Sequence, residues 1–221
     1  MNFFVNIHTH TAGKNTNICI NNLNFDSKLT ISQSENHFFS FGLHPWDVEN
    51  ANLEHFFLSL EQQIQKKSIV AVGEIGLDKA VVCDFSLQSS VFLEQLKLAQ
   101  KFNFPVIIHC VKAYYEILEI LKKQKVTIPI IFHQFMGNYE IYRQLIKFNS
   151  YFSFGKNLFL EKAKFFQYFD KIELSRVFFE TDDSEISIES VYEQASKLLN
   201  LDIEILKAQA YQNFNIVFRI K

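Results

Sequence analysis

Four histidines and two carboxylates of this 221-residue chain stand where short apolar segments end. These segments alternate with longer amphipathic stretches, a rhythm that predicts parallel β-strands joined by helices. Because the carboxyl ends of such strands meet on one face, we expect the six side chains to converge. Imidazoles and carboxylates in one pocket are typical ligands of Zn²⁺, Mn²⁺ or similar ions. The predicted ligands are His8, His10, Glu74, His109, His133 and Asp182.

The spacing of these ligands also predicts how they divide the work. His8 and His10 share one face of a strand, because side chains alternate faces with a period of two, so both can bind one ion. Six ligands exceed the four of a tetrahedral ion, which makes one or two divalent ions the expected cofactor and a two-metal site plausible. We expect Glu74 to bridge the ions. We expect Asp182 to be both a ligand and the base that accepts a proton from the attacking water.

Alternating short and long segments define the predicted architecture. Seven strands are predicted, at Phe3–His8, Phe38–Leu43, Ser68–Ile75, Pro105–His109, Ile128–His133, Tyr151–Phe154 and Arg176–Thr181. Helices are predicted at Leu87–Phe102, Tyr114–Lys123, Tyr139–Phe148, Leu160–Phe169, 188–199 and 203–218. An eighth strand is expected at Ile18–Leu23 or at Lys28–Ile31. Apolar strands covered by helices predict one TIM-like (β/α) barrel of seven or eight strands over residues 1–221.

Composition limits the classes of function. The net charge of −2 provides no basic field for nucleic acid, so any phosphate must be held by metal or by a few cations. Three scattered cysteines argue against a disulfide framework and favour a reducing cytoplasm. No basic leader precedes the first apolar segment, and no segment approaches the roughly 18 apolar residues of a membrane span. We therefore expect a soluble, cytoplasmic protein, and a monomer.

Several further side chains could contact a substrate. His44 lies in a GLHP segment, where it could touch substrate or pack against Pro45 and Trp46. Lys156 follows a predicted strand and could bind a phosphate or be a solvated loop residue. Asp78 follows Glu74 closely and could orient a ligand histidine from behind. Trp46 and a second aromatic, Phe135, could stack on a base or simply pack in the core.

Six motifs run in order along the chain: IHTH, FGLHPW, VGEIGLD, PVIIHC, FHQFMG and FETDD. Together they resemble the TatD family of metal-dependent deoxyribonucleases, which have amidohydrolase-like barrels, and in particular a shorter bacterial branch of it. The family's H-x-H pair falls on His8 and His10, and its glutamate on Glu74. Its two later metal histidines fall on His109 and His133, and its ETD aspartate on Asp182. The resemblance implies Mg²⁺ as the cofactor, DNA or a small phosphoester as the substrate, and trimming of DNA from the 3′ end.

Three positions depart from the family pattern. Asn6 stands where the family often has an acid, and residues 134–137, QFMG, replace CFSG. Val111 stands where many members have arginine, so the neighbouring Lys112 is the candidate for a phosphate contact at this place. Two alternatives stay open. One is a metal-dependent hydrolase of an amide, a lactone or a phosphomonoester, although no predicted strand ends in a lysine that could bridge two ions after carbamylation. The other is a metal-holding module without catalysis.

Overall fold

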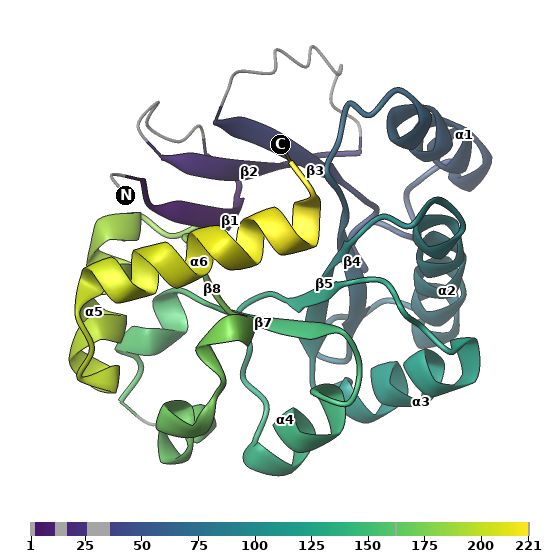
Figure 1. Cartoon of the computed structure of the whole chain (residues 1–221). Helices are drawn as coiled ribbons and strands as arrows, with labels where there is room; N and C mark the ends of the chain where they lie inside the picture. Colours follow the sequence, from purple (N-terminus) through teal and green to yellow (C-terminus); the bar gives the residue numbers. More distant parts are fainter. Residues whose placement is uncertain (1–2, 12–16, 26–35, 162, 221) are drawn as a thin grey trace.

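Eight short strands form one parallel sheet in which each strand pairs with the next along the chain (Figure 1). The computed structural model describes residues 3–11, 17–25, 36–161 and 163–220. The strands are β1 (Val5–Thr9), β2 (Ile18–Leu23), β3 (His37–Phe41), β4 (Ala71–Asp78), β5 (Val106–Val111), β6 (Ile130–Phe132), β7 (Ser150–Phe154) and β8 (Val177–Phe179). The expected TIM-like barrel is confirmed, with eight strands. The eighth is Ile18–Leu23, whereas the alternative at Lys28–Ile31 lies outside the described residues.

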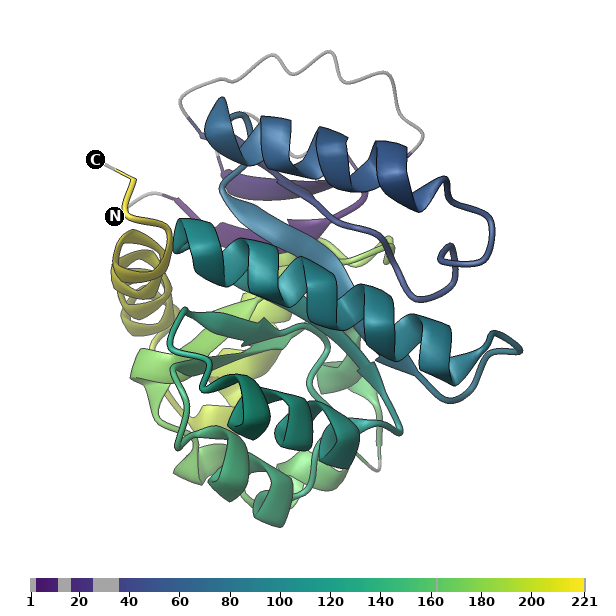
Figure 2. The same cartoon turned by 90° about the vertical axis from the view of Figure 1, so that its right-hand side faces the viewer.

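Helices cover the outside of this sheet. They are α1 (Leu53–Gln65), α2 (Phe85–Phe102), α3 (Tyr114–Gln124), α4 (Tyr139–Leu145), α5 (Ile188–Leu199) and α6 (Ile203–Phe218). Figure 2 shows α1, α2 and α3 following one another along one side of the barrel. Every residue of β1 and of β4 is buried, as a sheet covered on both faces requires. None of the helices in the described ranges has the length and apolar character needed to cross a bilayer.

The helix α6 covers the amino-terminal end of the barrel. Its Phe214 packs against Phe38 at the start of β3, with ring centroids 5.5 Å apart. The fully buried Asn213 donates a hydrogen bond to the carbonyl oxygen of Val177, the first residue of β8, at 2.8 Å. Because this end is covered, the opposite end, where the strands finish, is the one available for a site.

The segment after β7 differs from its prediction. A helix was expected at Leu160–Phe169, but the structure has separate 3₁₀ turns at Lys156–Phe159, Lys164–Gln167 and Phe169–Lys171. The rings of Phe165 and Phe169 lie 5.0 and 4.9 Å from that of Phe154 in β7. The backbone is extended at Leu160 and at Ala163, and none of these turns has a side-chain cap. The aromatic spacing therefore reflects packing of short turns onto the barrel rather than one continuous helix.

The barrel closes between β8 and β1 at the strand ends. One isolated backbone bridge, between Thr9 and Asp182, joins the two sides within the described residues. The Asp182 N–H donates to the His8 carbonyl at 3.0 Å, and the His10 N–H donates to the Asp182 carbonyl at 3.1 Å. The closure therefore involves the same residues that carry the predicted metal ligands.

Side chains complete this seam between β1 and β8. The Tyr192 hydroxyl, from α5, lies 3.3 Å from the Val5 N–H and 3.1 Å from the Val5 carbonyl, so it pairs with both backbone groups. The Asn6 amide donates to the Thr181 hydroxyl at 2.8 Å and accepts from the Thr181 N–H at 3.1 Å. Asn6, which departs from the family pattern, thus holds the first strand to the last.

Candidate metal centre

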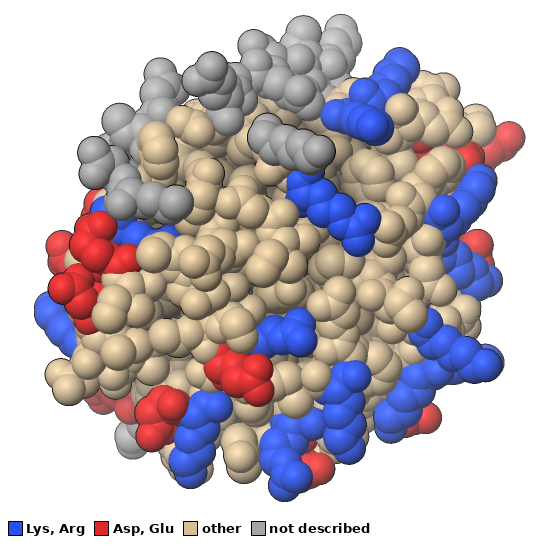
Figure 3. All heavy atoms as spheres, in the orientation of Figure 1, with Lys and Arg blue, Asp and Glu red and all other residues tan. Residues whose placement is uncertain are grey.

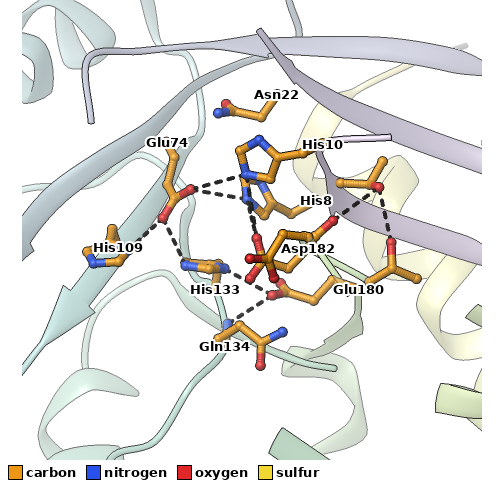
Figure 4. A network of polar contacts seen from close by, with 12 residues as sticks. His8, His10, Asn22, Glu74, His109, His133, Gln134, Glu180 and Asp182 are labelled. Atoms are coloured by element: carbon orange, nitrogen blue, oxygen red, sulfur yellow. Dashed lines mark hydrogen bonds and ion pairs between the residues drawn. The ribbon is translucent and has the colours of Figure 1, made fainter. Parts of the chain in front are cut away.

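Glu74 lies in the middle of β4 and contacts histidines from several strands (Figure 4). Its Oε2 is 3.2 Å from His8 Nε2 and 3.8 Å from His10 Nε2. Its Oε1 is 2.6 Å from His109 Nδ1 and 2.9 Å from His133 Nε2. Each oxygen therefore faces its own set of histidines, with His44 Nε2 also 3.4 Å from Oε1. This is the arrangement expected of a carboxylate shared by two ions.

Asp182 completes the side of the cluster that contains β1. Its Oδ1 lies 3.6 Å from His8 Nε2 and 3.5 Å from His10 Nε2. Its Oδ2 lies 3.2 Å from the Lys156 Nζ, which also contacts Asp183 Oδ1 at 2.6 Å. Asp182 has φ of 54°, a left-handed conformation that costs a non-glycine residue free energy and is often found at functional sites. The bonds across the seam hold this conformation in place.

The chemistry of the cluster fits divalent ions. Both ring nitrogens of His8 are buried and have no hydrogen-bond partner with good geometry, an arrangement that is costly unless a ligand completes it. Three overlapping groups have ligand atoms within 4.8 Å of one another, namely His8, Glu74 and His133; His8, His10 and Asp182; and His44, Glu74 and His109. The structure therefore brings all six predicted ligands together, with His44 beside them.

The charges of the cluster depend strongly on one another. Burial lowers the pKa of His8, but the carboxylates of Asp182 and Glu74 outweigh burial and raise it to about 9. Burial likewise lowers the pKa of His133, while Glu74 and Glu180 raise it well above its usual range. Burial raises the pKa of Glu74, yet the facing imidazoles, His133 first, hold it well below the ordinary value. In the metal-free protein, protons on the imidazoles thus take the place of cations.

Two buried carboxylates stand behind the histidines on the other side of Glu74. Asp78 Oδ2, as the sequence suggested, lies 3.2 Å from His109 Nε2. Glu180, which we did not predict as a site residue, lies 3.0 Å from His133 Nδ1 through its Oε1 and is fully buried. The available signal was an acid two positions before Asp182, on the same face of an otherwise apolar strand.

Gly76 allows the two ligand-bearing strands β4 and β5 to approach each other. Its φ is +154°, and a Cβ at this position would overlap the carbonyl oxygen of His109. Within the VGEIGLD motif, glycine therefore serves the close backbone approach that sets His109 beside Glu74.

A cavity of about 1070 Å³ opens above the cluster. The three substrate-contact candidates His44, Lys112 and Lys156 all line it, as does Lys164. Exposed apolar side chains surround its mouth: Trp46, Tyr115, Met136 and Leu160, with 58%, 62%, 37% and 49% of their surface exposed.

Phe135 is not among the residues that line this cavity. It is fully buried against Phe132 and Phe152, so the suggestion that it could stack on a base is wrong.

His44 is held at the edge of the cluster by its neighbour. Its Nε2 is 3.4 Å from Glu74 Oε1, and its Nδ1 accepts a hydrogen bond from the Trp46 backbone N–H at 3.2 Å. Burial lowers its pKa despite the facing Glu74 carboxylate. The structure thus places His44 next to the predicted bridge, while Lys112 is exposed on the rim.

An eight-stranded parallel barrel with histidine and carboxylate ligands at its open end defines a metal-dependent hydrolase barrel as the class of this protein. Within that class the chain belongs to the TatD family, because the family model of TatD related DNases matches residues 5–219. The resemblance seen in the motifs is thereby confirmed.

Individual relatives agree with this assignment. The chain is 29% identical to YabD of Bacillus subtilis, named an uncharacterized metal-dependent hydrolase, over 82% of the chain and 77% of YabD. It is 37% identical to the 3′-5′ ssDNA/RNA exonuclease TatD of Edwardsiella piscicida, over 37% of the chain and 31% of that protein. Several other curated relatives are also matched over less than half of their length. The crystal structure of the TatD homologue YJJV from Escherichia coli has the same fold, with a TM-score of 0.86, 19% identity, and coverage of 99% and 98%.

Proposed function

We propose that the protein is a divalent-metal-dependent phosphodiesterase that trims DNA from strand ends, with Mg²⁺ as its ion. The carrying observation is the Glu74 carboxylate, whose two oxygens face separate sets of histidines. Two ions held in this way suit the attacking and leaving oxygens of an in-line displacement at phosphorus. The exonuclease name of the Edwardsiella relative supports nucleic acid as the substrate class.

The proposed mechanism assigns each residue a local task. His8, His10 and Asp182 would hold one ion, His109 and His133 would hold the other, and Glu74 would be shared between them. Bound divalent ions polarise a phosphoryl oxygen and make water more acidic. Asp182 accepts the proton of the attacking water at Oδ2, the oxygen turned away from the two histidines. Lys156, beside that oxygen, offers its ammonium group to a phosphate oxygen of the bound strand.

The distribution of charge favours a strand end over a clamped duplex. On the face shown in Figure 3, which is the one that carries α6 in Figure 1, Lys and Arg side chains are scattered among Asp and Glu side chains and form no continuous basic track. With a net charge of −2, release of counterions from many phosphates cannot drive binding. The cavity instead offers Lys112, Lys156 and Lys164 close to the ions, and exposed aromatic side chains on which single-stranded bases can stack.

The test uses single-stranded oligonucleotides labelled at either end, incubated with Mg²⁺ or Mn²⁺. We expect stepwise release of mononucleotides from the 3′ end, and an activity that depends only weakly on salt. Glu74→Gln should abolish turnover because it removes the bridge. The matched control is Glu119→Gln, which changes an exposed glutamate on α3 that pairs only with Lys122 in the described contacts.

Two outcomes contradict the proposal. The first is turnover of an amide, a lactone or a simple phosphomonoester by metal-loaded protein that leaves oligonucleotides intact, which assigns the site to another hydrolysis. The second is the absence of any turnover in protein that contains its full complement of metal, which supports a role in holding metal alone.

A further inference from the structure

His109 and His133 face Glu74 Oε1 with different ring nitrogens. His109 turns its Nδ1 toward Glu74 Oε1, at 2.6 Å, and its Nε2 toward Asp78 Oδ2, at 3.2 Å. His133 turns its Nε2 toward the same Glu74 oxygen, at 2.9 Å, and its Nδ1 toward Glu180 Oε1, at 3.0 Å. Each imidazole thus lies between the central glutamate and a second carboxylate.

This geometry decides where each imidazole carries its proton once a metal ion is bound. A neutral imidazole has one N–H donor and one lone pair, and a carboxylate can only accept. Asp78 therefore fixes the proton of His109 on Nε2, and Glu180 fixes the proton of His133 on Nδ1. We infer that Asp78 and Glu180 are positioning residues that hold His109 and His133 in opposite tautomers, so that His109 Nδ1 and His133 Nε2 both present a lone pair on the side of Glu74 Oε1. The inference rests on the metal centre of the proposed function and not on its substrate.

Asp78 is itself held rigidly. It is 2% exposed, and its Oδ2 also accepts a hydrogen bond from the Trp46 indole N–H, at 2.7 Å. Its Oδ1 accepts from the Ala80 backbone N–H, at 2.7 Å, and its own N–H donates to the buried Gln88 side chain, at 2.8 Å. Three donors thus use both oxygens, so the carboxylate cannot rotate away from His109 without breaking one of these bonds.

Glu180 is held from the other side of the cluster. Its Oε1 accepts from the Gln134 backbone N–H, at 3.1 Å, as well as from His133. Gly155 makes room for it, since a Cβ there would come within 3.2 Å of the Glu180 Cγ. Its Oε2 has no hydrogen-bond partner within the described part of the chain. One oxygen of Glu180 therefore does all the positioning.

This difference between the two carboxylates predicts different responses to an amide. Glu180→Gln can keep an acceptor oxygen at the Oε1 position, with its amide nitrogen where Oε2 has no partner, so His133 keeps its tautomer. Asp78→Asn must place its amide nitrogen against a donor, because both Asp78 oxygens accept N–H groups. Glu180→Met keeps the volume of the side chain but offers His133 no acceptor.

The first experiment titrates metal-free protein with Mn²⁺ by calorimetry, without any substrate. Glu180→Met and Asp78→Asn should weaken binding of one of the two ions by about 10–100-fold, the usual scale for losing such a partner. Glu180→Gln should bind with nearly the wild-type affinity. Glu119→Met and Glu119→Gln are the matched controls on an exposed helix position. Equal affinities for wild-type and folded Glu180→Met protein, or equal losses in Glu180→Met and Glu180→Gln, overturn the inference.

The second experiment uses the wild-type protein, so its result does not depend on whether a variant folds. Nitrogen-15 spectra of the imidazoles, recorded on wild-type protein loaded with diamagnetic Zn²⁺, distinguish the two tautomers directly. We expect the proton of His109 on Nε2 and that of His133 on Nδ1, and finding both histidines in the same tautomer overturns the inference. Because neither experiment uses a substrate, a failure here leaves the phosphodiesterase proposal standing, and inactivity toward DNA leaves these results intact.

Discussion

Loading the site with a divalent ion should release protons into solution. Burial lowers the pKa of His8, but Asp182 and Glu74 raise it to about 9, so His8 is protonated near neutral pH in the metal-free protein. Burial also lowers the pKa of His133, but the Glu74 and Glu180 carboxylates outweigh burial and raise it well above its usual range. A metal ligand must be neutral imidazole, and so the ion has to displace these protons.

The size of the effect follows from the pKa of His8. With a pKa of about 9, roughly one molecule in 100 has neutral His8 at pH 7, so the ion binds about 100-fold more weakly there than above pH 9. The affinity should rise about tenfold per pH unit for each displaced proton, and then level off above the pKa. In the metal-free protein, the same raised pKa stabilises the fold below the ordinary value of 6.5, and this stabilisation is lost as the pH rises through about 9.

Calorimetry in two buffers of different ionisation enthalpy measures the number of protons released per Mn²⁺ bound. We expect between one and two at pH 7.5, and about one fewer for His8→Gln. The control His55→Gln alters an exposed histidine on α1 and should change nothing. Binding that releases no protons, with an affinity independent of pH between 7 and 9, would refute the reasoning.

Three further predictions concern turnover. Gly76→Ala should lower kcat by about 100-fold, because the added Cβ overlaps the His109 carbonyl and forces β4 and β5 apart. Asp182→Asn should lower kcat by about 10²–10⁴-fold while at least one ion stays bound, as measured by elemental analysis of the same sample. Tyr115→Ala, at the exposed mouth of the cavity, should weaken binding of a single-stranded oligonucleotide by about 1–3 kcal/mol, whereas turnover of a small phosphodiester without a base should change little. Wild-type rates for the first two variants, or equal effects of Tyr115→Ala on both substrates, would contradict these assignments.

The barrel could be predicted because each strand is a separate apolar segment. The pattern is local, and eight such segments in a parallel order leave few other arrangements. We predicted no element at Leu53–Gln65, although Phe56, Leu60 and Ile64 recur there with helical spacing and form the buried face of α1. The failed helix at Leu160–Phe169 shows the opposite error, since rings that pack on β7 mimic a helical pattern in a segment of short turns.

The candidate site could be predicted in its membership but not in its internal order. The position of each ligand at the end of a strand indicates that the six side chains meet, and the structure brings them together. No spacing in the sequence shows that Glu74 divides the histidines into two sets, because that division depends on the rotation of its side chain. Likewise, the role of Glu180 depends on one 3.0 Å contact with a residue 47 positions away.

The seam between β1 and β8 also sets the moment at which the protein can become active. Asp182 is the last of the six ligands in the chain, and it meets His8 and His10 only when the last strand has joined the first. A ribosome that has translated β7 has already made five of the six ligands, but the set stays incomplete until Asp182 is made and the barrel closes. Partly synthesised or truncated chains therefore lack a finished centre. Under the proposed function, hydrolysis would begin only with closure, so a nascent chain would not attack nucleic acid around it while it is still being made.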